Sequence, residues 1–567
     1  MATLARAERP TLDRHLPWVL ALVLALAVWA PVLGRGYVLA YDMVFVPRPA
    51  LGDASLGVAG GVPRAVPGDF LVALGAHVVP SWVLQEALLV AIVVLACVGA
   101  WRMSPARTLT GAGVTAVLYT WNAFVAERLG MGHWSLLLGY AVLPWLLRAC
   151  GRVAERGPWP VVLWCAVSAA AAPTAGVLTA VVACVAAVLV PQPAWSRAVG
   201  AAGALVVNLP WLLAGVASSG LLSADRTGTD VFAARSDTPL GGLVSLLTFG
   251  GIWNSDVWPA ARASAFSSGA TLVVVGVGVV GLVLTVRTRA TGATVAVVVG
   301  VLGLLLSVPT LYPAGRDLFA ALTAHVPAAG ILRDSQKWLA WWALAVAYGV
   351  GPGLERLVER LAGWNRVWVA TATGLVVLAA MPGLAWGLGD RLEPVRWPSD
   401  YESAADAVDR VPGDAPVLVL PFHDFRAWSW NHRHTTLDPW TRLVGRRVVV
   451  NDALETTGGT VAGEDPLAAR VRTLPVRDGR YSADALRRAG IGLVVVDRAT
   501  AVAPGDAVGV SGHATVVHDG PRVRVLDLGA ATAVGSDRSD WLLGVDLAVT
   551  VVVAIAAGVL LSRRRRR

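Results

Sequence analysis

The chain has 567 residues, of which 56% are hydrophobic and only 15% are charged. Soluble domains carry about a quarter charged residues, so the composition excludes an ordinary soluble protein and indicates a polytopic α-helical membrane protein. The net charge of +9 is explained by basic residues beside spans and by attraction to membrane lipid, so no nucleic-acid partner is inferred.

Apolar runs of about 20 residues, the length of a membrane-spanning helix, recur along the chain. They predict about 12 spans, near residues 16–34, 81–101, 108–126, 134–150, 158–172, 174–191, 198–217, 268–286, 291–311, 337–354, 367–388 and 541–562. The two runs beside Pro173 are also compatible with one kinked span. Arginines follow alternate spans, and basic loops stay cytoplasmic. Both termini are therefore expected on the cytoplasmic side of the cytoplasmic membrane.

Three long segments are expected outside. Two are outer loops, 35–80 and 218–267, of a transmembrane bundle of about 11 helices that covers residues 1–388. The third, 389–539, has the pattern of a small extracytoplasmic α/β domain. Strands are predicted at 415–422, 446–452 and 491–498, with a helix at 482–490 capped by Ser482 and Gly490 and a closing hairpin. Residues 540–567 supply the last span and a cytoplasmic arginine tail.

Ionisable residues near the outer ends of spans are candidate functional groups, because a charge near hydrocarbon is costly. Asp42, in "LAYDMVFVPRP", is a candidate general base; a solvated loop residue or a helix N-cap is the alternative. Glu86, one turn inside the second span, is expected to pair with Arg333 or Lys337 if it faces the bundle.

The outer turn after the third span carries four polar residues. Either they face a cavity and contact a phosphate and a sugar, or they form ordinary ion pairs and helix caps; these residues are Asn122, Glu127, Arg128 and His133.

A dense polar run, "GILRDSQKWL", opens the Trp-rich span at 337–354. Arg333 and Lys337 are spaced i, i+4, so on an α-helix they would share one face and suit a phosphate or pyrophosphate group. Asp334 and Gln336 would hold these side chains or bind hydroxyls. An interfacial anchor of Arg, Lys and Trp is the alternative.

The stretch "PFHDFRAWSWNHRHTTLDPW" (421–440) gathers histidines and tryptophans. His423, His432 and His434 lack a recognised ligand spacing, so no metal site is predicted. Three tryptophans suit either sugar stacking or a packed interface, the second being favoured; they are Trp428, Trp430 and Trp440.

Four stretches, "NAFVAERLGMGHWSLLLGYAVLPWLLR", "LLTFGGIWN", "GILRDSQKWL" and "TLDPWTRLVGRRVVVND", together resemble a group of actinobacterial polytopic membrane proteins. That group is similar to the N-terminal membrane region of arabinofuranosyltransferases of the D type and to the broader GT-C glycosyltransferase superfamily. The resemblance implies a polyprenyl-phosphate sugar donor, a catalytic acid in the first outer loop, here Asp42, and donor-phosphate ligands at Arg333 and Lys337. Residues 41–43 read Tyr-Asp-Met, without the family's paired acid, which puts metal dependence in doubt.

These expectations favour a membrane glycosyltransferase that acts at the outer face on a cell-envelope glycan or glycolipid. No cofactor is certain, and a divalent cation is left open. One alternative is a transporter or flippase of a lipid-linked intermediate, which predicts inverted repeats and ionisable groups at the membrane midplane. The other is a non-catalytic scaffold in envelope assembly.

Overall fold

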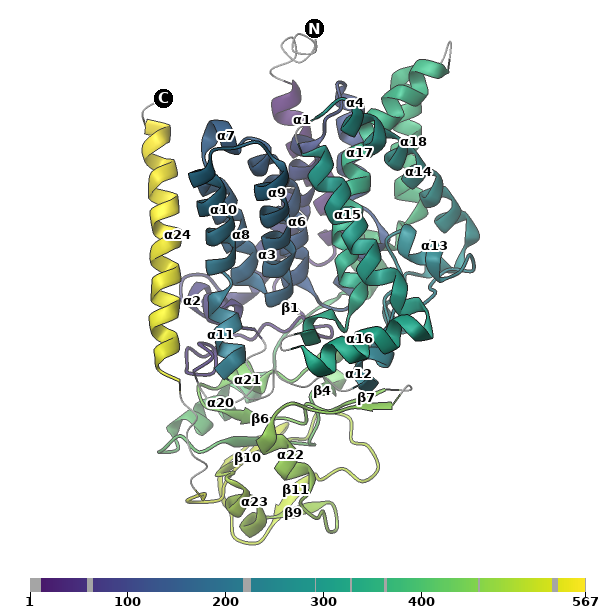
Figure 1. Cartoon of the computed structure of the whole chain (residues 1–567). Helices are drawn as coiled ribbons and strands as arrows, with labels where there is room; N and C mark the ends of the chain where they lie inside the picture. Colours follow the sequence, from purple (N-terminus) through teal and green to yellow (C-terminus); the bar gives the residue numbers. More distant parts are fainter. Residues whose placement is uncertain are drawn as a thin grey trace.

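The computed structural model describes residues 12–58, 65–217, 226–290, 292–326, 329–361, 365–456, 459–532 and 539–565. A helical bundle forms the larger part of the molecule, and a β-rich domain covers one end of it (Figure 1). Both chain termini lie at the opposite end of the bundle. The domain boundaries and the assignment of these two ends to sides of a membrane stay predictions.

Helices occur at every one of the predicted spans. They are α1 (Leu12–Trp29), α3 (Ser81–Met103), α4 (Leu109–Thr120), α6 (Trp134–Cys150), α8 (Trp159–Ala171), α9 (Pro173–Leu189), α10 (Ala194–Val206), α11 (Leu209–Ala217), α14 (Ala265–Arg287), α15 (Ala293–Ser307), α17 (Leu339–Arg360), α18 (Arg366–Ala380) and α24 (Trp541–Arg565). α8 and α9 pack side by side, since a Cβ added to Gly176 would lie 3.1 Å from Ala169 Cα. The two runs beside Pro173 are therefore two helices and not one kinked span.

Shorter helices connect these elements. They are α2 (Gly68–Ala76), α5 (Ala123–Gly130), α7 (Val153–Arg156), α12 (Arg226–Val231), α13 (Gly242–Leu247), α16 (Pro313–His325), α19 (Ala385–Asp390), and the 3₁₀ turns η2 (Ser255–Val257), η3 (Ala260–Ala263), η4 (Val308–Leu311), η5 (Ala329–Leu332), η6 (Ser335–Trp338) and η7 (Pro382–Leu384).

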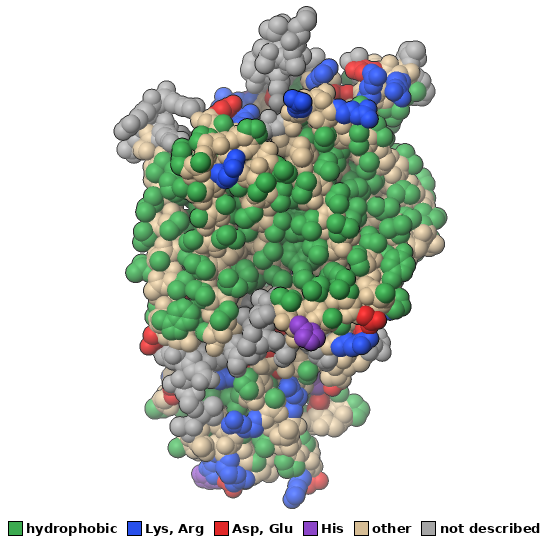
Figure 2. All heavy atoms as spheres, in the orientation of Figure 1, with side chains coloured by type: hydrophobic (Ala, Val, Ile, Leu, Met, Phe, Trp, Pro, Cys, Tyr) green, Lys and Arg blue, Asp and Glu red, His purple; other side chains and the backbone are tan. Residues whose placement is uncertain are grey.

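The helices are those of a membrane protein. Among the described residues, five helices are long and apolar enough to cross a membrane, or up to seven if each of two bent pairs is one span. Three further apolar helices, α6, α8 and α9, are shorter. The predicted count of about 12 spans therefore stays a prediction. Figure 2 shows hydrophobic side chains over the middle of the molecule, with Lys and Arg side chains gathered near the termini and on the β-rich domain.

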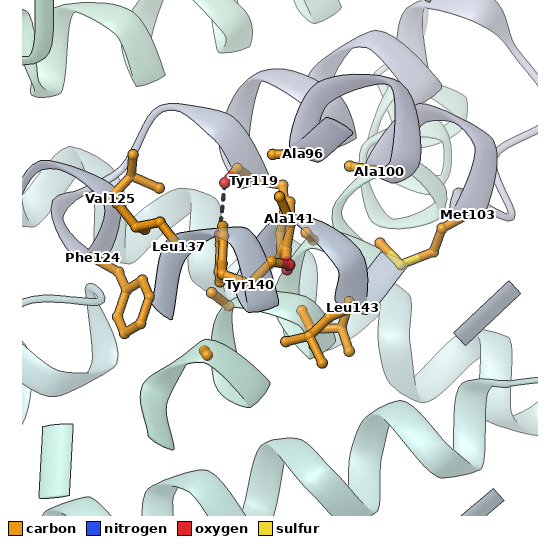
Figure 3. Close-up of a cluster of buried hydrophobic side chains, with 14 of the residues drawn as sticks. Ala96, Ala100, Met103, Tyr119, Phe124, Val125, Leu137, Tyr140, Ala141 and Leu143 are labelled. Atoms are coloured by element: carbon orange, nitrogen blue, oxygen red, sulfur yellow. Dashed lines mark hydrogen bonds between the residues drawn. The ribbon is translucent and has the colours of Figure 1, made fainter. Parts of the chain in front are cut away.

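The bundle packs through small residues and a buried tyrosine pair. A Cβ on Gly281 of α14 would overlap the carbonyl oxygen of Gly349 in α17, so glycine allows these two backbones to touch. Between α4 and α6, the rings of Tyr119 and Tyr140 stack with centroids 4.1 Å apart. Each hydroxyl donates to the backbone carbonyl of the other tyrosine, at 2.7 and 2.6 Å (Figure 3), so both tyrosine hydroxyls are hydrogen-bonded.

The β-rich part contains a five-stranded mixed sheet in the order β12-β13-β10-β3-β6. β3 (Val417–Leu420) is parallel to β10 (Leu493–Asp497) and β6 (Val448–Val449), while β12 (Thr515–Asp519) and β13 (Val523–Asp527) form the antiparallel hairpin. Strands thus lie in each of the predicted stretches. The predicted helix is α23 (Ala483–Ala489), and Gly490 ends it with φ of 101°. Ser482 occupies the predicted N-cap position, although its side chain makes no capping hydrogen bond.

The remaining elements of this part surround the sheet. They are β2 (Pro394–Val395), α20 (Ser399–Arg410), β4 (Phe425–Ala427), η8 (Ser429–Asn431), β5 (Thr435–Leu437), α21 (Trp440–Leu443), β7 (Leu454–Thr456), β8 (Gly459–Val461), α22 (Pro466–Arg472), β9 (Arg480–Ser482) and β11 (Gly509–Ser511).

Candidate active site

The loop that carries Asp42 is clamped by the β-rich domain. Its first strand, β1 (Tyr37–Val38), pairs with β2. Tyr41 N donates to Thr435 O at 2.6 Å, and Leu437 N donates to Tyr41 O at 2.9 Å. The carbonyl of Leu39 accepts further hydrogen bonds from Asn431 and Thr436, at 3.2 and 3.4 Å. The position of Asp42 is therefore set by residues about 400 positions later in the chain.

The other side of this loop rests on the turn between α5 and α6. A Cβ on Gly132 would overlap the backbone of Ala40 and Met43, so glycine at 132 is what lets the two segments meet. Asp42 N donates to Met131 O at 3.2 Å. His133 then lies beside Asp42, with its Nε2 3.2 Å from Asp42 Oδ2. The Asp42 side chain is 45% exposed, so its carboxylate stays accessible to a substrate.

A chain of polar contacts runs from His133 into the bundle through Arg128. Arg128 is 1% exposed and its Nη1 lies 3.2 Å from His133 Nδ1. Its guanidinium donates to both carboxylate oxygens of Asp334, at 2.7 and 3.2 Å, and to Gln336 Oε1 at 3.3 Å. Burial alone would raise the pKa of Asp334, but the charges of Arg128 and Lys337 and the hydrogen bonds from Arg128 lower it. Asp334 is therefore ionised at neutral pH.

Lys337, three residues after Asp334, has no ion-pair partner among the described residues. Its Nζ lies 3.4 Å from the hydroxyl of Thr174 and 5.8 Å from the Trp338 ring. No carboxylate among the described residues lies within ion-pair distance of this partly buried amine. An unpaired cation at the mouth of a bundle is costly, so the amine is suited to an anionic ligand.

Arg333 and Lys337 are not related as predicted. Residues 333 and 337 fall in bends and the 3₁₀ turn η6, before α17 begins. The i, i+4 argument for one shared helix face is therefore wrong. Arg333 instead pairs with Glu464 of the β-rich domain at 3.1 Å, whereas Asp334 and Gln336 hold Arg128.

Two other predicted site residues have structural partners. Asn122 is the buried N-cap of α5, where it accepts from Val125 N at 3.1 Å. Glu127 is 3% exposed and accepts from the backbone N–H of Gly251 and Ile252. Neither side chain faces an open cavity with Arg128 and His133. Of the four polar residues predicted to act together in this turn, only Arg128 and His133 are in contact.

The predicted partner of Glu86 is wrong. Its Oε1 accepts from the backbone N–H of Gly34 at 2.8 Å, and neither Arg333 nor Lys337 has Glu86 as its partner. The first outer loop also lines a cavity, but not at Asp42. That cavity includes Val44 and Trp134 but neither Asp42 nor the two cations.

Two buried residues near Glu127 were not predicted from the sequence. Arg262 pairs with Asp237 through two hydrogen bonds, at 2.7 and 2.9 Å, and both side chains are at most 1% exposed. Burial would raise the pKa of Asp237, but these hydrogen bonds and the charge of Arg262 lower it. The pair fixes the loop after α12, and its two members carry no spacing or motif that would have revealed it.

The tryptophans of residues 421–440 pack together, and two of the histidines in this stretch pair with carboxylates. Trp428 and Trp440 are fully buried and Trp430 packs against them, so the packed interface, and not an exposed sugar platform, is correct. His423 pairs with Asp506, and His432 with Glu393. No group of three possible metal ligands occurs within the ranges that the structure describes.

Comparison with solved structures reveals a shared fold. The arabinofuranosyltransferase AftD from Mycobacteria matches with a TM-score of 0.59 and 18% identity, over 91% of this chain and 40% of that enzyme. The chain therefore shares the fold of the matched part of that enzyme. A substitution variant of the same enzyme matches equally well, over 91% and 42% of the two chains.

Other comparisons add little. An oligosaccharyltransferase from Archaeoglobus fulgidus has a TM-score of 0.42 and 11% identity, over 87% of this chain and 70% of the other, a likeness too distant to define a shared fold. No family model and no curated protein matches the sequence. The chain spans about two fifths of the length of the mycobacterial enzyme.

Proposed function

We propose that the chain is a membrane glycosyltransferase that transfers a sugar from a polyprenyl-phosphate donor to a cell-envelope glycan or glycolipid at the outer face. The observation that carries the proposal is the line of contacts from the accessible carboxylate of Asp42, through His133 and Arg128, to Asp334, which lies three residues before the unpaired amine of Lys337. The candidate base therefore lies at one end of this line of contacts, and the candidate phosphate-binding cation follows the other end in the sequence. The fold shared with the mycobacterial enzyme supports the same reaction class.

The reaction needs only a direct displacement. Asp42 takes the proton from an acceptor hydroxyl, and the resulting oxygen attacks the anomeric carbon of the donor sugar. The bond between that carbon and the phosphate oxygen breaks, and its electron pair leaves with the polyprenyl phosphate. Lys337 stabilises the charge that develops on this leaving phosphate. His133 is a positioning residue, because it touches Asp42 and is itself held by Arg128.

Lys337 is the stronger candidate for the phosphate. It is the only lysine among the 47 Lys and Arg residues of the chain, so a position that needed only positive charge would more commonly hold arginine here. A compact ammonium suits a phosphate oxygen as a point charge. Arg333, the other predicted ligand, already has Glu464 as a partner, and it would have to leave this carboxylate to bind the donor.

The test is transfer by purified protein in nanodiscs that contain a radiolabelled polyprenyl-phosphate sugar and a short glycan acceptor. Asp42→Asn keeps the shape of the side chain and removes the base, so product formation should fall about a hundredfold or more, the usual effect of losing such a group. Asp414→Asn, an exposed carboxylate of the β-rich domain, is the control and should leave transfer unchanged. Full activity of Asp42→Asn would exclude the catalytic role of Asp42, whereas no product from the parent protein would favour the scaffold.

A further inference from the structure

A cavity of about 180 Å³ lies between the first outer loop and the β-rich domain. One wall is apolar and comes from the segments next to the candidate active site: Val44 and Phe45 follow Asp42, and Trp134 follows His133. The rings of Phe45 and Trp134 lie 5.4 Å apart. A cavity of roughly 150 Å³ holds a six-membered ring, so this space accommodates one ring-sized ligand.

The opposite wall is polar and nearly balanced in charge. It holds three arginines and four aspartates. Arg442 pairs with Asp69 at 3.2 Å, and Arg447 pairs with Asp465 at 2.8 Å. Because the described lining carries no excess of positive charge, it does not favour a phosphate or a carboxylate. Neighbouring guanidinium donors and carboxylate acceptors instead match hydroxyl groups, which donate and accept at once.

Two donors on this wall lack acceptors. Arg446 Nη1 and Arg447 Nε are buried and form no hydrogen bond within the described part of the chain. Arg446 is anchored by another nitrogen, Nη2, which donates to Val411 O at 2.7 Å, so its side chain is fixed beside the cavity. Leaving a buried donor unsatisfied costs about 1–3 kcal/mol, and a ligand oxygen would remove that penalty.

We propose that this cavity binds one neutral sugar ring of the acceptor glycan, with the Phe45–Trp134 wall against the ring and Arg446 donating to its hydroxyls. The segments that build the apolar wall are continuous with Asp42 and His133, so a sugar held here belongs to a glycan whose next unit reaches the base. The identification of this glycan as acceptor rests on the proposed transferase function; the binding of a sugar does not.

Binding is tested on the full chain in nanodiscs by ligand-observed saturation-transfer NMR, with methyl α-D-arabinofuranoside, methyl α-D-mannopyranoside and inorganic phosphate as probes. At least one glycoside should bind and phosphate should not. Arg446→Gln should weaken glycoside binding about tenfold, which corresponds to one lost hydrogen bond. Arg410→Gln removes an exposed arginine of the same domain and should change nothing.

A second variant tests the cavity independently, in case Arg446→Gln impairs folding. Ala54→Phe places a large side chain in the cavity wall and should abolish glycoside binding while the protein elutes as the parent does. Binding of phosphate alone, no binding of either glycoside, or parental affinity in both variants would overturn the proposal. Asp42→Asn should still bind the glycoside. Sugar binding without any transfer by the parent would therefore refute the transferase function and leave the cavity assignment intact.

Discussion

Arg128 and Asp334 form a bidentate ion pair with the guanidinium 1% and the carboxylate 17% exposed. Such a pair contributes little net stability, but removal of one partner leaves an uncompensated charge. We expect Arg128→Gln to lower the free energy of unfolding by about 3 kcal/mol. The double variant Arg128→Gln/Asp334→Asn should recover part of that loss, because neither member of the pair stays buried without the other.

Thermal unfolding in detergent would measure these effects on the ion pair. A double variant that is less stable than the sum of the two single variants would contradict this account of Arg128. Arg356→Gln breaks an exposed i, i+3 pair with Glu359 and should change stability by less than about 0.5 kcal/mol.

Lys337 and Arg333 allow the phosphate role to be assigned to one side chain. Lys337→Met should weaken binding of polyprenyl phosphate about tenfold or more, because a charge-assisted contact contributes about 1.5–3 kcal/mol. Arg333→Gln should have a much smaller effect, since Arg333 already pairs with Glu464. Microscale thermophoresis with a fluorescent polyprenyl phosphate would measure both. The reverse order of effects would move the phosphate site to Arg333.

At the scale of elements, α14 and α17 meet through glycine. A Cβ on Gly281 would overlap Gly349 O, whereas one on Gly276, in the same helix, would meet nothing within 4 Å. Gly281→Ala should therefore destabilise the protein by roughly 1–3 kcal/mol through overpacking. Gly276→Ala should be neutral or stabilising, because alanine favours a helix over glycine by about 1 kcal/mol. Equal melting temperatures for the two variants would show that the helices do not touch at Gly281.

A second element, β5, positions the Asp42 loop. Thr436 is buried and its hydroxyl contacts Leu39 O, whereas Thr435 on the same strand is exposed. Thr436→Val preserves shape but removes the hydroxyl, which costs about 1 kcal/mol and lets the loop shift. We expect transfer to fall about tenfold, because the base would be slightly misplaced. The effect on kcat should be larger than the effect on KM. Thr435→Val is the control and should retain parental activity. Parental activity of Thr436→Val would contradict the role of the domain in positioning Asp42.

Across the whole molecule, the sequence predicted what depends on local pattern. Hydropathy located the helices, and short continuous apolar runs located the strands in 415–422, 446–452 and 491–498. The sequence also indicated that Arg128 and His133 are neighbours, since they lie on one short turn. It missed contacts between distant residues: Glu86 with Gly34, Arg333 with Glu464, and the clamp of Thr436 on Leu39. The i, i+4 rule failed at 333–337 because it assumes an α-helix, and the chain there forms a 3₁₀ turn.

The last prediction concerns orientation in the membrane. The termini and the turn α7 lie at one end of the bundle and the β-rich domain at the other (Figure 1), and arginines such as Arg152 and Arg156 gather at the former end. Because basic loops stay cytoplasmic, the β-rich domain should lie outside.

In a variant with the four native cysteines changed to serine, a membrane-impermeant thiol reagent should label Asp414→Cys in intact cells. Glu155→Cys, in α7 and also exposed, should react only after the membrane is permeabilised. Labelling of both positions in intact cells, or of Glu155→Cys alone, would overturn this orientation and with it the outer-face reaction, since Asp42 lies at the same end as the β-rich domain that clamps it.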